Sequence, residues 1–299
     1  MSSIAYVTDE NMIEYFRLCG IRQMNFWRLS SRKEFTDFQK GDLLFFYTRT
    51  PHSRSRGFVG YAHYVSTQKL SLKGMWKKYG TSNGYDSEQL LNEAIQRAAK
   101  DRPVPEKMNC LYLNDAVFFS NPVNPNEVGL KISPQLESYM YLDQEDPQMT
   151  VRILRAAEQK GIDIWSNSQS YESEDIFKSD EIRHQLTLIK DGMPADSWNQ
   201  KERTRAQKLA AASGLEFIRG SKTDVFELQK DQLILSLPFV SQEKDKPYLV
   251  REYIGKVMMY RLMLQKSGLR MPAVRFQILH DEEAPEELLM LTTNINEEH

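Results

Sequence analysis

A group of basic side chains stands between two apolar runs in residues 45–66, FFYTRTPHSRSRGFVGYAHYVS. Arg49, His52, Arg54 and Arg56 fall in the middle, and the stretch contains no acid. The flanking runs have the composition of strands, so the basic residues are expected on a hairpin loop. Such a loop is suited to contact with phosphate groups. The alternative is a hairpin tip that only keeps the chain soluble.

The composition is that of a globular protein rather than a polycation. Of the 299 residues, 40% are hydrophobic and 27% are charged, and the formal net charge is −2. Residues 1–145 carry 18 Lys and Arg against 16 Asp and Glu, and the remaining residues carry 21 against 25. A nucleic-acid partner would therefore have to be bound by a local basic patch, because the overall charge does not attract a polyanion.

Cysteine and histidine usage argues against several classes of protein. Cys19 and Cys110 are too few for a disulfide framework, and together with five scattered histidines they lack the spacing of a zinc site. No apolar run is long enough for a transmembrane helix, and residues 1–16 do not resemble a signal peptide. We therefore expect a cytoplasmic protein with no membrane partner and no cofactor.

The first half of the chain is predicted to consist of short strands with small inserted helices. Asp9 is placed to cap a helix. After a Lys-Gly-Asp turn at residues 40–42, the next seven residues are almost all apolar, which predicts a central strand. The returning strand, 57–66, contains two glycines that indicate a bend or a close backbone approach. Several such curved strands favour a compact barrel, with residues 75–86 as a loop and residues 134–142 as a closing helix.

The pattern changes after residue 145, where the first domain is predicted to end. Residues 146–180 contain one helix and then a polar, Ser- and Asn-rich run that is typical of a linker. Residues 181–299 have the order α-β-β-α-β, with a hairpin turn at residues 229–231. The long helix 249–267 has a broad apolar stripe, and its Met258-Met259 pair could face a partner. The predicted fold class is therefore α+β.

The first domain resembles the EVE domain. The resemblance is carried by MNFWRL, by FQKGDLLFFYTRTPHSRSRGFVGYAHYVS, by MWKKYGTSNGYDS, and by LYLNDAVFFSNPV with KISPQLESY, and it covers roughly residues 20–143. The EVE domain belongs to the PUA-like barrel group, which also includes the YTH and ASCH domains. The resemblance implies a PUA-like barrel with an aromatic pocket that accepts one extruded, often modified, base. Prokaryotic relatives are associated with restriction that depends on modified cytosine.

Extruding a base from a duplex costs a few kcal/mol, which stacking on aromatic rings and contacts to phosphates must offset. Base-binding roles are predicted for Trp27, Tyr47, Trp76, Tyr79, Ser82, Asn83 and Tyr85, and phosphate-binding roles for Arg49, Arg54, Arg56, Lys77 and Lys78. The competing interpretation is that the strand aromatics, Trp27 and Tyr47, belong to the core. Trp76 and Tyr79 fall in the predicted polar loop, where exposure is the rule.

The second domain faintly resembles the core of PD-(D/E)XK nucleases, in which clustered carboxylates hold Mg²⁺ and activate water. Asp224 matches the first acid of that pattern, and Glu202 is a candidate additional ligand. However, Ser236 and Pro238 stand where the second acid and the lysine are required. The alternative is that Asp224 only caps or turns a strand. This domain is therefore interpreted as a degenerate nuclease-like fold or an unrelated α/β module that recruits an effector.

Three functional hypotheses follow from these observations. The first is a sensor of a modified base, most specifically modified cytosine in DNA, that acts with a protein effector in modification-dependent restriction or phage defence. The second is an active Mg²⁺-dependent endonuclease built on Glu202 and Asp224. The third is a reader of modified RNA, since YTH and PUA relatives bind RNA.

Overall fold

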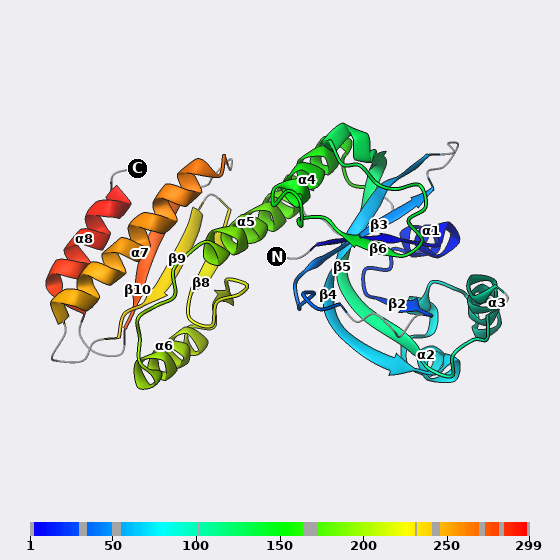
Figure 1. The fold of residues 1–299 in the computed structure, drawn as a ribbon, viewed down its shortest axis with the longest axis horizontal. Coiled ribbons are helices and arrows are strands. Elements are labelled where there is room, and N and C mark those ends of the chain that lie inside the picture. Colours follow the sequence, from blue (N-terminus) through cyan, green and yellow to red (C-terminus); the bar gives the residue numbers. More distant parts are fainter. Residues whose placement is uncertain are drawn as a thin grey trace. The chain divides into compact units, whose positions relative to one another are not determined.

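The computed structural model describes residues 3–29, 35–49, 55–100, 102–163, 173–230, 232–240, 246–268, 273–280 and 284–297. Contacts divide the chain into two compact units, which we call unit 1 (residues 1–177) and unit 2 (residues 178–299). Unit 1 therefore continues beyond the predicted limit at residue 145 and includes the helix that was assigned to the connecting segment. Figure 1 shows the elements of both units. No helix in the described ranges has the length and apolar character needed to cross a bilayer.

Unit 1 is built on one six-stranded mixed sheet with the order β2-β5-β4-β3-β1-β6. The strands are β1 (Ile4–Val7), β2 (Met24–Arg28), β3 (Leu43–Arg49), β4 (Arg56–Leu70), β5 (Met108–Val123) and β6 (Tyr139–Tyr141). β1 and β3 run parallel, and the other neighbours are antiparallel. Helices α1 (Glu10–Leu18), α2 (Leu72–Tyr79), α3 (Glu88–Ala99) and α4 (Met149–Lys160) and the 3₁₀ turns η1 (Gly80–Asn83) and η2 (Pro125–Val128) complete the unit.

The predicted central strand is confirmed as β3. It lies between β4 and β1, and all of its residues are buried except Arg49 at its end. Alternate residues face two separate apolar clusters, so that Leu44 and Phe46 pack on one side of the sheet and Leu43 and Phe45 on the other. Burial on both faces explains the nearly continuous apolar sequence.

The long strands β4 and β5 bend together. Their ladder shifts register at three places, as expected for β-bulges, which kink and twist the strands. One shift lies between Phe58 and Gly60, where a Cβ atom on residue 60 would lie 2.4 Å from the carbonyl oxygen of Val117. The predicted close backbone approach is thus confirmed at Gly60. No ladder among the described residues joins β2 to β6, so the closed barrel stays a prediction.

Helices cover both faces of this sheet. The first cluster receives Met12 and Phe16 from α1, together with side chains of α2 and α3, whereas Ile153 and Leu154 of α4 pack into the second. The predicted cap of α1 is confirmed, since the carboxylate of Asp9 accepts a hydrogen bond from the backbone N–H of Met12 at 3.0 Å. Each of these four helices therefore packs against one of the two apolar clusters.

Unit 2 contains a four-stranded sheet with the order β10-β9-β8-β7. Its elements are α5 (Ser173–Asp191, which begins in unit 1), α6 (Gln200–Ala212), β7 (Glu216–Phe217), β8 (Val225–Gln229), β9 (Gln232–Pro238), α7 (Lys246–Lys266), β10 (Ala273–Leu279) and α8 (Glu286–Glu297). β8 and β9 form the predicted hairpin, and β10 runs parallel to β9. The observed order differs from the predicted α-β-β-α-β series, because three strands rather than two lie between α6 and α7 and because α8 follows β10.

Three local predictions were wrong. Residues 134–142 contain no helix: Tyr139–Tyr141 form strand β6, because pairing with β1 satisfies their backbone groups. The predicted loop at residues 75–86 is largely helical, since α2 extends to Tyr79 and η1 follows it. The predicted linker at 166–180 overlaps α5, whose first residue is Ser173. Tertiary contacts override weak local signals in each case.

Gly84 and Gly129 form a matched pair for testing the packing of unit 1. Each ends a 3₁₀ turn in the left-handed conformation, with φ of +88° and +74°. A Cβ at position 84 would lie 2.3 Å from Met12 Cγ, whereas one at position 129 would meet no atom within 4 Å. We expect Gly84→Ala to destabilise the protein by about 1–3 kcal/mol more than Gly129→Ala in chemical denaturation. Equal losses of stability in the two variants would show that α1 shifts at this contact without a free-energy cost.

Candidate nucleic-acid interface

Strand β2 and turn η1 are joined by a buried side-chain amide pair. The amide N–H of Asn25 on β2 donates to Asn83 Oδ1 on η1 at 2.8 Å, and both residues are fully buried. Asn83 also donates to the carbonyl oxygens of Met75 at 3.1 Å and Gly80 at 2.7 Å. Asn83 was predicted to read a base edge. Its enclosed side chain instead holds η1 against α2 and β2.

Two aromatic residues beside this amide pair carry polar atoms that are buried without a hydrogen-bond partner. They are the indole N–H of Trp27, two residues after Asn25, and the hydroxyl of Tyr85, two residues after Asn83. Burial raises the pKa of Tyr85, so the phenol stays protonated. An unpartnered buried polar atom costs free energy unless a water or a ligand satisfies it. The sequence singled out both side chains for their rings alone.

Trp76 approaches the same region from α2. Ser71 caps this helix by accepting a hydrogen bond from the backbone N–H of Gly74 at 3.2 Å. Within α2, Met75 is fully buried, whereas Trp76 is only partly buried and packs against the first cluster, as Trp27 does. α2 contacts β2, so the two indoles belong to adjoining elements. Ser82 on η1 is also partly exposed.

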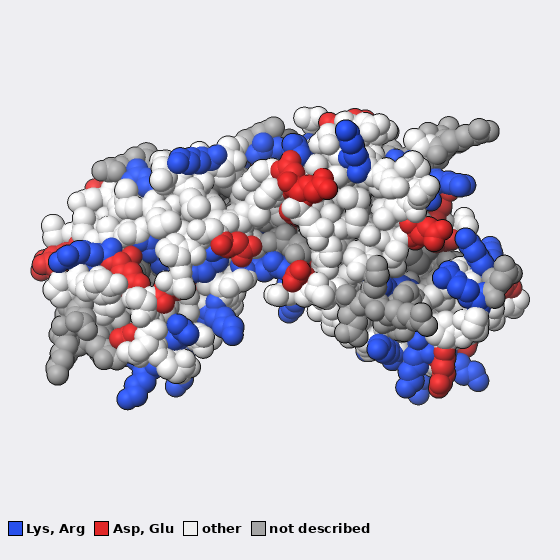
Figure 2. Space-filling model, viewed as in Figure 1, with Lys and Arg blue, Asp and Glu red and all other residues white. Residues whose placement is uncertain are grey.

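A group of exposed lysines surrounds α2, and we call it the lysine edge. Lys69 ends β4, Lys107 precedes β5, and the paired residues Leu70 and Met108 hold these two strand ends together. The full set is Lys69, Lys73, Lys77, Lys78 and Lys107, all exposed. Figure 2 shows Lys and Arg side chains gathered at the α2 end of unit 1 with few acidic groups among them.

Lys77 and Lys78 were predicted to bind phosphate, whereas Lys69, Lys73 and Lys107 were not. A signal was available, since residues 43–85 contain no Asp or Glu and seven Lys or Arg. Only residues 45–66 of that run were noted as free of acids. Lys107 lies outside the run and reaches the lysine edge through the pairing of β5 with β4.

Tyr79 contacts β4 and β5 through Gln68 and Tyr112, and Gln68 lies at the register of Trp27 because both pair with Cys110. Its ring stacks on Tyr112 with centroids 5.8 Å apart, and its hydroxyl is hydrogen-bonded to the amide of Gln68. The ammonium of Lys78 lies over the same ring, 5.2 Å from its centroid, and donates to Gln68 Oε1 at 2.8 Å. Tyr79 therefore orients Lys78 and Gln68, and the ring of Tyr112 covers one face of the Tyr79 ring.

Arg49 and Arg56 lie at the opposite end of β4 from the lysine edge. Arg49 and Arg56 face each other where β3 pairs with the start of β4, and Arg56 donates to the carbonyl oxygen of Leu136 at 3.0 Å. Twelve residues of β4 separate Arg56 from Gln68, about 40 Å along the strand. Arg54 and His52 lie outside the described residues. The structure thus separates the two basic groups that were predicted to grip one site.

Tyr47 is also separated from the tryptophans. It follows Leu43 and Phe45 on the same face of β3 and packs in the second cluster, with its ring centroid 5.4 Å from that of Phe58. Trp27 and Trp76 pack against the first cluster, on the other side of the sheet. Tyr47 is therefore a core residue, as the competing interpretation held.

An additional aromatic group in unit 1 already encloses a cation. The guanidinium of Arg28 lies 4.6 Å from the ring centroid of Phe35, 5.5 Å from that of Tyr139 and 5.9 Å from that of Tyr6. Arg28 is only 5% exposed. Cation–π attraction of this kind strengthens when the cation is desolvated. This group therefore stabilises the fold around β1, β2 and β6.

In unit 2, the carboxylate of Asp224 is the centre of a buried ionic cluster. It accepts hydrogen bonds from Lys256 at 2.7 Å, from Lys190 at 2.8 Å and from the hydroxyl of Tyr260 at 2.8 Å. Burial opposes its ionisation, but the two ammonium groups outweigh that effect and hold the pKa of Asp224 at about 2. Lys256 also donates to Asp196 at 2.9 Å. The oxygens of Asp224 are thus committed to protein donors.

Glu202 is committed as well. Its carboxylate accepts a hydrogen bond from the backbone N–H of Asn199 at 2.8 Å, and the side chain of Asn199 accepts bonds from the first turn of α6, which together form a capping box. The described residues contain no group of three or more His, Cys, Asp or Glu side chains able to hold a metal ion. The ammonium of Lys256 stands between Asp196 and Asp224, where the nuclease hypothesis would require a divalent cation.

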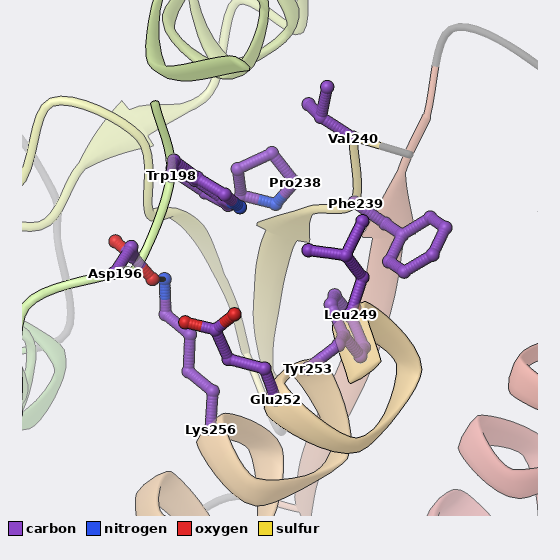
Figure 3. Close-up of a pocket in the computed structure, with 9 residues that line it drawn as sticks. All are labelled: Asp196, Trp198, Pro238, Phe239, Val240, Leu249, Glu252, Tyr253 and Lys256. Carbon is purple, nitrogen blue, oxygen red and sulfur yellow. Dashed lines mark hydrogen bonds and ion pairs between the residues drawn. The ribbon is translucent and has the colours of Figure 1, made fainter. Parts of the chain in front are cut away.

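A small open hollow adjoins this cluster, with about 290 Å³ of empty space that is partly open to solvent. Figure 3 shows Trp198 and Pro238 on one side and Phe239, Leu249 and Tyr253 on the other, with Asp196, Glu252 and Lys256 on the polar side. Lys256 lies 5.3 Å from the Trp198 ring centroid, and Glu252 accepts a hydrogen bond from the backbone N–H of Ser197 at 2.9 Å. The polar side chains of the hollow are therefore already bonded to other groups of the protein.

No protein-family profile and no curated relative matches this sequence. The crystal structure of ASCH from Zymomonas mobilis has 16% sequence identity, with a TM-score of 0.36 over 50% of this chain and 93% of that chain. A mutant of the same protein gives 15% identity and the same TM-score over 50% of this chain and 97% of that chain. ASCH is one of the PUA-like domains named above. Likenesses this weak carry no argument, and the EVE and nuclease resemblances stay predictions.

Asp224→Asn is expected to reduce the stability of unit 2 by about 3 kcal/mol at pH 7, because two largely buried ammonium groups would lose their counterion. A depressed carboxyl pKa stabilises the fold above the unfolded pKa. The contribution of Asp224, on the order of 2 kcal/mol, should therefore be lost as the pH falls from about 4 to about 2. The Asp224→Asn variant should not show this loss of stability between about pH 4 and about pH 2.

Hydrogen exchange of the α7 amides would report the stability of unit 2 in both proteins. Glu216→Gln is the matched control within unit 2, because it weakens an ion pair with Arg183 in which the side chain of Glu216 is 48% exposed. Exposed pairs contribute at most about 1 kcal/mol. Similar losses for the two variants would contradict the buried-cluster argument.

Proposed function

We propose that unit 1 binds nucleic acid at the lysine edge and accepts one extruded base beside Trp27 and Trp76. The observation that carries the proposal is the unpartnered buried indole N–H of Trp27 beside exposed lysines that have few neighbouring acids. Lysines bind phosphates without reading sequence, whereas aromatic faces and buried donors recognise bases. The region around α2 and β2 thus offers both phosphate-binding lysines and base-recognising aromatic groups.

The energetics of an extruded base fit this arrangement. Removing a base from a duplex costs a few kcal/mol, and stacking on an aromatic side chain returns about 1–3 kcal/mol. The indole N–H of Trp27 and the hydroxyl of Tyr85 would each gain a hydrogen bond to a polar base edge. Asn83 keeps its structural role and takes no part in reading the base.

The finer part of the proposal concerns the base itself. The EVE resemblance favours a modified base, most specifically a modified cytosine in DNA, and a role in modification-dependent restriction or phage defence. RNA is the competing ligand, since related domains bind it. Arg49 and Arg56, at the other end of β4, would contact the same strand only several nucleotides away.

Unit 2 is proposed to act as a binding module that recruits a protein effector rather than as a nuclease. Support comes from the commitment of Asp224 to Lys190 and Lys256 and from the capping role of Glu202. A carboxylate held by two ammonium groups has no free oxygens for Mg²⁺. Cleavage of modified DNA in the presence of Mg²⁺, abolished by Asp224→Ala, would contradict this assignment.

Binding should depend on the lysine edge and on salt. Neutralising Lys73 and Lys77 together (Lys73→Gln with Lys77→Gln) is expected to weaken binding of every oligonucleotide and to lower the salt slope of log K by about 2. Fluorescence anisotropy with DNA and RNA oligonucleotides, each carrying one modified or unmodified cytosine, would measure both effects. Lys131→Gln, an exposed lysine outside the lysine edge, is the matched control. An unchanged slope would overturn the proposed phosphate contacts.

The base pocket is tested separately. Trp76→Ala should reduce affinity by about tenfold or more through lost stacking. Trp27→Phe keeps a ring but removes the unpartnered N–H, so it should reduce the preference for the modified base more than it reduces overall affinity. Equal binding of modified and plain oligonucleotides by the unaltered protein would reject base recognition while leaving phosphate binding intact.

A further inference from the structure

The outward face of α7 is apolar where a surface helix normally carries polar residues. Tyr248 is 59% exposed, Met258 46% and Leu262 50%, and Met259 is 36% exposed beside them. The opposite face, with Leu249, Tyr253, Val257, Tyr260 and Leu264, packs in the core of unit 2. α7 therefore has two apolar faces, of which the fold of one chain covers only one.

The exposed positions on α7 follow the spacing of a helix–helix contact. Exposed residues occur at 248, 251, 255, 258 and 262, alternating steps of three and four. These five positions share one face of α7, which we call the seam, and a second helix can pack along such a face. The Met258-Met259 pair, which the sequence marked as able to face a partner, lies at its centre. Figure 2 shows uncharged surface around α7 and α8 that is interrupted by Lys, Arg, Asp and Glu side chains.

Gly255 is an independent sign that a backbone approaches this seam. It lies in the interior of α7 with an ordinary helical φ, where glycine destabilises a helix relative to alanine. A Cβ at this position would meet no atom within 4 Å, so no contact within the chain requires the glycine. A glycine at the seam lets a second helix approach more closely.

Helix α8 supplies a second apolar surface with the opposite charge. The side chain of Asn296 bonds both the backbone N–H of Phe276 at 2.9 Å and its carbonyl oxygen at 3.0 Å, so α8 covers the free edge of β10. Its outward side chains include Leu289, Met290 and Leu291, which are 46%, 60% and 38% exposed.

The two helices have complementary charges. The exposed charged side chains of α7 include Arg251 and Lys266, whereas α8 carries Glu286, Glu287 and Glu297 and no base. Among the described residues, exposed Arg251 on α7 and exposed Glu286 and Glu287 on α8 form no ion pair. These charges are therefore available to an external partner.

We propose that this surface is the interface of a homodimer, in which α7 of one copy packs against α8 of a second copy around a twofold axis. A twofold interface must be self-complementary, because each contact from one copy to the other occurs twice. One chain that carries both a basic and an acidic apolar helix meets this requirement. Helices of 21 and 12 residues are about 32 and 18 Å long, which suits a standard interface of about 800 Å² per partner.

Dimerisation would place two copies of unit 1 in one assembly. Two nucleic-acid sites held together raise the apparent affinity for a ligand that reaches both, without any new contact. The inference does not rest on nucleic-acid binding, since it uses residues of unit 2 alone. Failure of either proposal leaves the other standing.

Sedimentation velocity of the full chain at micromolar to tens of micromolar concentration would test the proposal. We expect a species of twice 34.9 kDa, which Met258→Glu converts to monomer because it places a charge in an apolar interface. Leu90→Glu is the matched control, since Leu90 is 43% exposed on α3 of unit 1 and should have no effect. A monomer at all concentrations, or a dimer that survives Met258→Glu, would overturn the proposal.

Three further variants test the details of the interface. Gly255→Leu should weaken dimerisation at least tenfold while the monomer melts at the same or a higher temperature, because its side chain enters space that is empty in the single chain. Arg251→Glu should also weaken dimerisation, and adding Glu286→Arg and Glu287→Arg should restore it. Dimers that the reversed glutamates do not restore would overturn the pairing of α7 with α8.

Discussion

The structure of unit 1 depends on a sheet that is apolar on both faces. β3 is buried on either side, so helices must cover the two faces separately, and α1, α2 and α3 cover one while α4 covers the other. This requirement fixes the position of α2. Because Met75 is held in the first cluster, Trp76 lies at the margin of the core and the lysines of α2 face outward. The candidate interface is thus a consequence of how the sheet is covered.

Charged groups serve opposite purposes in the two units. The lysines of the lysine edge remain in solvent with few acids nearby, an arrangement that costs little folding free energy and favours a polyanion. Lys190 and Lys256 are largely buried and are tolerated because Asp224 neutralises them and hydrogen-bonds to both. The same residue type therefore indicates binding in unit 1 and structural support in unit 2. Only burial and partners distinguish these roles.

In unit 2, the feature that points to a function is the exposure of apolar side chains. Its polar groups are internally satisfied at Asp224 and at Glu202, whereas α7 and α8 leave large side chains in solvent. Large apolar side chains left in solvent on a helix face are a feature of association surfaces. A nucleic-acid site in unit 1 and an association surface in unit 2 would fit a protein that senses one molecule and assembles with another.

The sequence by itself determined the features that depend on local pattern: the Asp9 cap, the apolar strand at β3, the close approach at Gly60, the hairpin of β8 and β9 and the long helix α7. These follow from side-chain periodicity and turn chemistry, which neighbouring residues fix. Only the tertiary structure decided which predicted site residues meet. It placed Tyr47 across the sheet, enclosed Asn83 and put Arg49, which pairs with Arg56, at the opposite end of β4 from the lysines. The face and the strand end on which a side chain lies depend on pairing between distant segments, and no local pattern records that pairing.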